Sequence, residues 1–191
     1  ARQGFALNEQ TLGVPVIATR HLVAQSPEVF ADWRPVSALA PGVLGQTGVE
    51  TGEVICGVLD RVRPAAVIAV DALAAGRLSR LLRTVQLADT GITPGAGVGN
   101  ARAALNEQTL GVPVIAVGVP TVVDGATLAH EISSQLGQPA CEALDDLSQP
   151  VMITTRDIDR EVADISRMIG YAVNMALHPH LSVADIDLYL S

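Results

Sequence analysis

The chain has 191 residues, which fits one domain with a substantial core. Hydrophobic residues make up 49% of it, yet every stretch long enough to cross a membrane is interrupted by a charge, Pro or Gly, so we expect no membrane span. The formal net charge of -8, from 12 basic and 20 acidic residues, argues against a nucleic-acid partner.

A segment near the start of the chain occurs twice. The letters ALNEQTLGVPVIA stand at 6–18 and again at 104–116, too long a match for chance and too isolated for a repeat array. The second copy continues smoothly into VGVPTVVD, so the first copy is interpreted as the intruder. We therefore divide the chain into an anomalous duplicated segment, 1–18, and a single domain, 19–191.

From residue 34 onward the hydrophobic pattern predicts alternating strands and helices. Strands are expected at 34–40, 66–70, 84–88, 112–117 and 151–154. Helices are expected at 50–62, 78–82, 127–136, 157–177 and from 182 onward. The continuous apolar run AVIAV at 66–70 is typical of a parallel strand that helices cover on both faces. The pattern predicts a three-layer α/β fold with a mostly parallel sheet.

Three carboxylates are candidates for a site. Asp71 directly follows AVIAV, and open α/β sheets place their sites in the crevice at the carboxyl ends of the strands. Asp89 and Asp124 are also expected at strand ends, where each could support Asp71 or serve as a turn or cap residue. Asp89 opens an Asp-Thr-Gly triplet, which aspartic proteases use in two copies to share a proton; here it occurs once.

The remaining motifs predict no cofactor and no metal. The segment GAGVGN at 95–100 lacks the glycine spacing of a dinucleotide site, and no Lys-Ser or Lys-Thr follows it. The four histidines lack metal-binding spacing. His178 and His180 flank Pro179 at a predicted helix end, where we expect cations to face the negative end of the helix dipole.

Several segments together resemble the germination protease of spore-forming bacteria. They are TRHLVAQSPE (19–28), RPVSALAPGVLGQTGVETGEVI (34–55), VIAVDALAA (67–75), DTGITPGAGVGNAR (89–102), TLGVPVIAVGVPTVVD (109–124), VMITTRDID (151–159) and ALHPHLS (176–182). They run in the family's order and cover nearly everything from Thr19 to the end of the sequence.

The resemblance implies an endopeptidase that degrades small acid-soluble spore proteins during germination. It implies a zymogen, assembled as a homotetramer in the cytoplasm of the spore core, with a fold similar to the hydrogenase maturation peptidases and an atypical aspartic mechanism. One of the family's two proposed catalytic aspartates falls on Asp71.

At the position of the family's second proposed catalytic aspartate, this sequence departs from the family's pattern. That aspartate belongs to a motif resembling Asn-Val-Thr-Pro-Asp-Ala-Leu-Gly-Pro, just before Thr-Arg-His-Leu, and the duplicated segment occupies that place. An ungapped alignment from His21 puts the aspartate at Ala6, and an alignment on Leu12 and Gly13 puts it at Gln10. Glu9 is a weak candidate to substitute. We also expect the family's first strand and its propeptide to be absent.

Three functions stay open. The first is the endopeptidase just described. The second is a catalytically dead family member or fragment that keeps the fold and the oligomer contacts, because a carboxylate pair that loses one member loses the division between base and acid. The third is a metal-dependent maturation peptidase.

Overall fold

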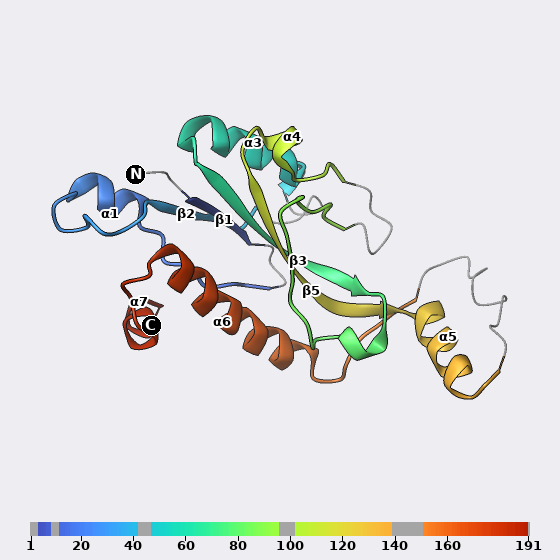
Figure 1. Ribbon diagram of the computed structural model, residues 1–191. Coiled ribbons are helices and arrows are strands. Elements are labelled where there is room, and N and C mark those ends of the chain that lie inside the picture. The colour runs from blue at the N-terminus through green and yellow to red at the C-terminus, as the bar shows by residue number, and fades with distance from the viewer. Residues whose placement is uncertain (1–3, 9–11, 42–46, 96–101, 139–150, 191) are drawn as a thin grey trace.

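The computed structural model describes residues 4–8, 12–41, 47–95, 102–138 and 151–190, and of 4–8 it describes the backbone only. The fold has three layers: α3 and α4 lie on one face of a sheet and α6 on the other (Figure 1). The elements are β1 (Gly4–Asn8), α1 (Arg20–Gln25), β2 (Val36–Leu39), α3 (Thr51–Val62), β3 (Ala66–Ala75), η1 (Leu78–Arg80), β4 (Gln86–Ala88), α4 (Glu107–Leu110), β5 (Val114–Asp124), α5 (Gly125–Gln135), β6 (Met152–Ile153), α6 (Ile158–Leu177) and α7 (Val183–Leu190).

The sheet is mixed, and its centre is parallel. The strand order is β2-β1-β3-β5-β4, with β6 pairing β5 beyond that path. The pairs β1 with β2, β1 with β3 and β3 with β5 are parallel, whereas β4 and β6 run antiparallel to β5. The predicted three-layer α/β fold is confirmed.

The largest departures of the strands from the prediction lie at three places. The strand predicted at 66–70 continues to Ala75, so Asp71 lies inside β3 and not at its end. The strand predicted at 112–117 runs from Val114 to Asp124. No strand was predicted at Gly4–Asn8, yet β1 lies between β2 and β3 and takes in the start of the duplicated segment.

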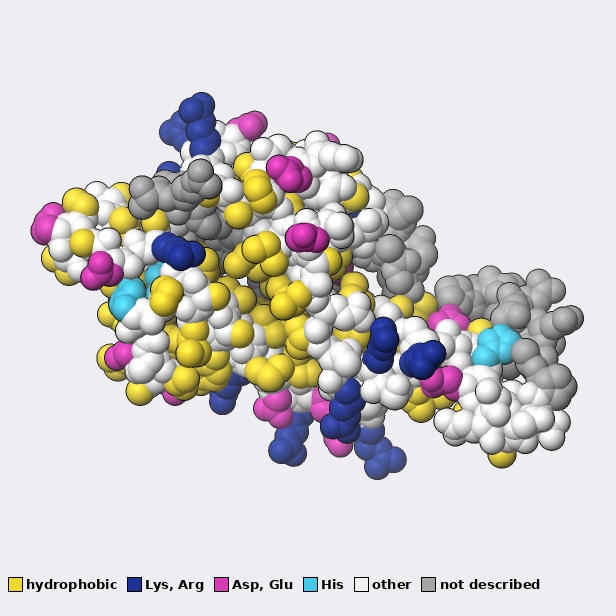
Figure 2. Space-filling view, in the orientation of Figure 1, with side chains coloured by type: hydrophobic (Ala, Val, Ile, Leu, Met, Phe, Trp, Pro, Cys, Tyr) yellow, Lys and Arg dark blue, Asp and Glu magenta, His cyan; other side chains and the backbone are white. Residues whose placement is uncertain are grey.

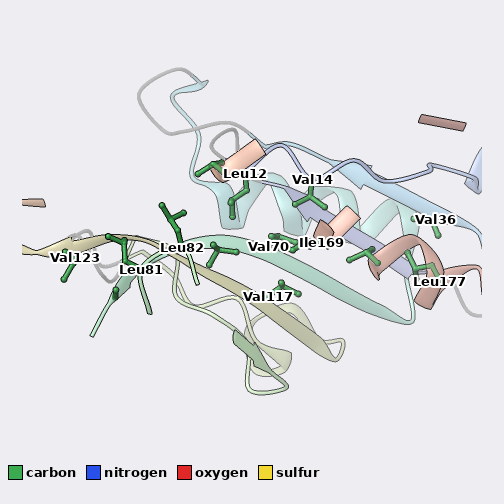
Figure 3. Close-up of a cluster of buried hydrophobic side chains, with 14 residues drawn as sticks. Leu12, Val14, Val36, Val70, Leu81, Leu82, Val117, Val123, Ile169 and Leu177 are labelled. Carbon is green, nitrogen blue, oxygen red and sulfur yellow. The ribbon is translucent and has the colours of Figure 1, made fainter. Parts of the chain in front are cut away.

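Two apolar clusters fill the spaces between the layers. The larger one joins α6 to one face of the sheet and includes Val70, Val117, Ile169 and Leu177 (Figure 3). The smaller one joins α3 to the other face; its members are Ile55, Leu59, Val67, Ala69, Leu105 and Val114. Alternate residues of β3 serve the two clusters, as expected for a strand covered on both faces.

The first copy of the repeat is fixed to α6 through Asn174. The Asn174 side chain is fully buried; its Oδ1 accepts from the Ile17 N–H at 2.9 Å, and its Nδ2 donates to the carbonyls of Pro15 at 3.0 Å and Gly170 at 2.8 Å. A Cβ at Gly170 would come within 2.7 Å of Pro15 Cγ, so this glycine permits the close approach.

An aromatic cluster surrounds Trp33 where α6 ends. The Trp33 ring lies 4.9 Å from His178, 5.2 Å from His180, 5.2 Å from Tyr189 and 5.6 Å from Phe30, between ring centroids. Burial lowers the pKa of His178 to about 4, with smaller contributions from the nearby His180 and Arg34. His178 is therefore a neutral ring in a packed cluster, and its expected role as a cation at the helix end is wrong.

Replacing Asn174 by Ala is expected to lower the free energy of unfolding by about 2 to 4 kcal/mol, because the buried Ile17 N–H and Pro15 carbonyl would lose their partner. Asn106→Ala is the matched control. Asn106 caps α4 by accepting from the Thr109 N–H, and losing such a cap costs about 1 kcal/mol. Urea denaturation of both variants measures the difference, and equal losses would contradict the anchoring role of Asn174.

The protein is expected to lose stability as the pH falls from about 6.5 toward 4. His178 keeps a lower pKa in the folded chain than the ordinary 6.5, so the unfolded chain binds a proton first in that window. Stability is full above pH 6.5, and the loss below it is up to about 3 kcal/mol. In denaturation measured across this range, His178→Phe should remove much of the slope, whereas His180→Phe should keep it. Equal slopes in the wild type and His178→Phe would contradict the assignment.

Candidate functional site

Asp71 is a buried carboxylate in the middle of the sheet. Its side chain is 4% exposed, and its Oδ1 accepts a hydrogen bond from the Ala72 N–H at 2.8 Å. By strand alternation it lies on the same face as Val67 and Ala69, the face that α3 covers. An acidic residue thus continues an apolar row, and burying a carboxylate among apolar groups is unfavourable unless polar groups offset it.

The neighbour of Asp71 on β5 is Gly118, the residue with which it is paired. A Cβ at Gly118 would come within 2.2 Å of Leu73 Cδ1 and 2.9 Å of Leu73 Cγ. The Leu73 side chain therefore occupies the space that a larger residue would need. The Leu73 side chain thus lies over Gly118, the residue beside Asp71 in the sheet.

Asp124 has a structural role. It is the last residue of β5 and the N-cap of α5, where its side chain accepts from the N–H groups of Ala126 at 2.8 Å and Thr127 at 3.4 Å. It lies six positions after Gly118, which corresponds to roughly 20 Å along the strand. The structure does not bring Asp124 to Asp71.

Asp89 is exposed just beyond β4. The preceding residue, Ala88, pairs with Ala116 in the amino-terminal half of β5. Asp89 is therefore two strand spacings, about 10 Å, away from β3 in addition to its offset along the sheet. The triplet ends at Gly91, which has a φ of 84° and would place a Cβ within 2.1 Å of the Leu105 carbonyl oxygen. This geometry fits a turn packed against the second copy.

The other candidate for a second carboxylate, Glu9, lies outside the described residues, as do Gln10 and the segment 96–101. β1 ends at Asn8, which is paired with Val70, the residue before Asp71. In sequence Glu9 follows Asn8 directly. Thr51, which no sequence motif singles out, is a buried residue at the start of α3, the helix that packs on the face of β3 to which Asp71 belongs.

Among the described residues, two hollows on the α6 side of the sheet stand out, and Asp71 lines neither of them. One has a volume of about 410 Å³ and only apolar lining side chains, among them Leu87, Ile115 and Met168. Apolar side chains also gather near the centre of the face shown in Figure 2. The other, also about 410 Å³, lies between the first copy and α6 and includes Ser166 and Arg167. Within the described ranges, no three His, Cys, Asp or Glu side chains come together so as to hold a metal ion.

The sequence of the chain is similar to that of one known protein family. The family model described as germination protease matches residues 6–137. The chain belongs to the germination protease family. It is 39% identical over 203 residues to the germination protease of Clostridium perfringens and 41% identical over 202 residues to that of Caldanaerobacter subterraneus. Both alignments cover 92% of this chain and 62% of the relative, so the chain spans less than two thirds of these relatives.

A further family member and one solved structure are also similar to the chain. The germination protease of Bacillus cytotoxicus is 53% identical over 117 residues, which cover 61% of this chain and 32% of the relative. A NiFe hydrogenase maturation protease from Thermococcus kodakarensis superposes with a TM-score of 0.41 at 15% identity, over 89% of this chain and 91% of the other. In the described part of the chain, no helix combines the length and apolar character of a membrane span.

Replacing Asp124 by Ala is expected to lower the free energy of unfolding by about 1 kcal/mol, because α5 loses its N-cap. Asp89→Ala removes an exposed carboxylate and should stay within about 0.5 kcal/mol of the wild type. Thermal or urea denaturation compares the two variants. A larger loss for Asp89→Ala than for Asp124→Ala would reverse this assignment of structural roles.

Proposed function

We propose that this chain is the peptidase part of a germination protease, an endopeptidase that cleaves small acid-soluble spore proteins in the cytoplasm of the spore core. It is made as a zymogen and works as a homotetramer, by an aspartic-type mechanism. The family membership supports this proposal, and one observation carries it. Strand β3, whose letters VIAVDALAA carry part of the resemblance to the family, buries a carboxylate, Asp71, in an otherwise apolar row.

Amide hydrolysis requires a base that takes a proton from water and an acid that assists the departing amine. Asp71, in its ionised form, is the proposed base. Glu9 is the proposed second carboxylate, because it follows directly on a strand whose last residue is paired next to Asp71. Asp71 is 4% exposed, so a peptide reaches it only after the covering side chains move aside.

Asp71→Asn is expected to reduce cleavage of a small acid-soluble spore protein by about 10⁴-fold or more, because the base is lost while the shape is kept. Asp89→Asn is the matched control and should cleave at the wild-type rate. The measurement is the rate of substrate loss by gel or mass spectrometry. Equal rates for Asp71→Asn and the wild type would exclude Asp71. A folded wild type without any cleavage would support the catalytically dead family member instead.

The duplicated segment supplies a matched control for the proposed second carboxylate. The same cleavage assay compares the two variants. Glu9 and Glu107 occupy the same position in two identical segments, so Glu9→Gln and Glu107→Gln change the same letter in the same local sequence. Only Glu9→Gln should slow cleavage. If both variants cleave like the wild type, Glu9 is not the second carboxylate.

A further inference from the structure

The α3 helix buries a hydroxyl group against the sheet. Thr51 is 5% exposed and is the first residue of the helix. Its Oγ1 is buried, and no hydrogen-bond partner for it exists among the residues that the structure describes. Because buried hydroxyl groups are nearly always paired, an open one at this position points to a partner that binds there.

The spacings of the helix and of the strand lead us to infer that Thr51 lies at the level of Asp71. Leu59 and Ile55 pack with Val67 and Ala69 in the smaller apolar cluster. Four residues of a helix advance about 6 Å, and two residues of a strand advance about 6.6 Å. The buried row of α3 and the buried row of β3 therefore have nearly the same spacing. The chain turns directly from the end of α3 into the start of β3, so the rows run in opposite directions along the sequence. One step beyond Ile55 is Thr51, and one step beyond Ala69 is Asp71.

We propose that Thr51 is a catalytic residue of the peptidase reaction, one that donates a hydrogen bond from its hydroxyl to the carbonyl oxygen of the scissile peptide bond. This inference rests on the proposed function. A donor that is aimed at the developing oxyanion and fixed before the reaction stabilises the transition state more than the ground state. Low exposure strengthens that hydrogen bond, because little water competes for it.

Hydrolysis of the peptide bond proceeds with Asp71, Thr51 and one water molecule. Asp71 takes a proton from water, and the water oxygen forms a bond to the carbonyl carbon. The carbonyl π electrons move onto the oxygen, which accepts the hydrogen bond from Thr51. When the tetrahedral intermediate collapses, the C–N bond breaks. In the net balance the proton taken by Asp71 ends on the amine nitrogen.

The start of α3 is suited to hold a negative oxygen. The first turn of a helix has N–H groups without partners inside the helix, and its dipole is positive at that end. Glu50 and Glu53 form a capping box that orders this turn. The Glu53 carboxylate accepts from the Glu50 N–H at 3.3 Å, whereas the buried Thr51 hydroxyl has no partner among the described residues.

The test compares Thr51→Val, which removes the hydroxyl at nearly constant shape, with Thr51→Ser, which keeps it. Cleavage of a small acid-soluble spore protein is measured as kcat and KM, and stability by urea denaturation. Thr51→Val should lower kcat by about 10²- to 10³-fold with little change in KM. Thr51→Ser should stay within a few-fold of the wild type. The denaturation midpoint of Thr51→Val should equal or exceed that of the wild type, because an unpaired buried hydroxyl is gone.

Thr121→Val is the control for losing any buried threonine hydroxyl. Thr121 is 6% exposed on β5, three residues beyond Gly118, and its replacement should leave kcat unchanged. If Thr51→Val keeps the wild-type kcat, or if Thr121→Val lowers kcat equally, the proposed role of Thr51 is overturned. The proposed role of Asp71 is unaffected by either result. A loss in Thr51→Val that tracks a lower denaturation midpoint also overturns it. If the wild type does not cleave the substrate, or Asp71→Asn cleaves it equally well, the proposed function fails and this inference fails with it.

Discussion

The pairing of β3 with β5 is the interaction on which the rest of the structure depends. The register holds from Val67 opposite Val114 to Ala75 opposite Val123, with a single shift after Leu73. Both apolar clusters draw side chains from these two strands, so the two helical layers are joined through them. A slip by one residue would turn Asp71 from the α3 face to the α6 face and exchange every apolar row. The position of the candidate site is therefore a consequence of this register.

The duplicated segment shows how far local sequence can determine structure here. Asn8 lies in strand β1, whereas the equivalent Asn106 caps helix α4. Ile17 lies in an irregular stretch and is bound by Asn174, whereas the equivalent Ile115 is inside β5. Local preferences are identical in the two copies, so the difference comes from the surrounding contacts, which outweigh intrinsic propensity. What the copies share is a glycine turn: Gly13 and Gly111 both have positive φ angles.

The elements that the sequence predicts well have a clear local pattern of apolar residues. The elements that it does not predict are stabilised by contacts with segments distant in the sequence. Helix α6 follows from its long apolar periodicity, and its observed bounds differ from the prediction by one residue at the start. Strand β5 continues beyond its predicted end at Val117 although it contains Pro120, which cannot donate to a ladder. The structure accommodates Pro120 opposite Leu73, directly before the register shift. Asp71 could be selected from the sequence because it ends an apolar run, but its burial and its separation from Asp89 and Asp124 depend on strand order, which no local pattern encodes.

The Thr51 hydroxyl and the Asp71 carboxylate each follow a row of buried apolar side chains. Along α3 the buried face reads Leu59, Ile55, Thr51, and along β3 it reads Val67, Ala69, Asp71. Each row changes from apolar to polar at its next buried position, and burying a polar group in an apolar layer is unfavourable unless polar partners offset it. Two neighbouring elements, α3 and β3, therefore each bury a polar side chain next to the same apolar cluster. Such exceptions are typical of sites that trade stability for chemistry, and this is the basis for proposing that the hydroxyl and the carboxylate act in one mechanism.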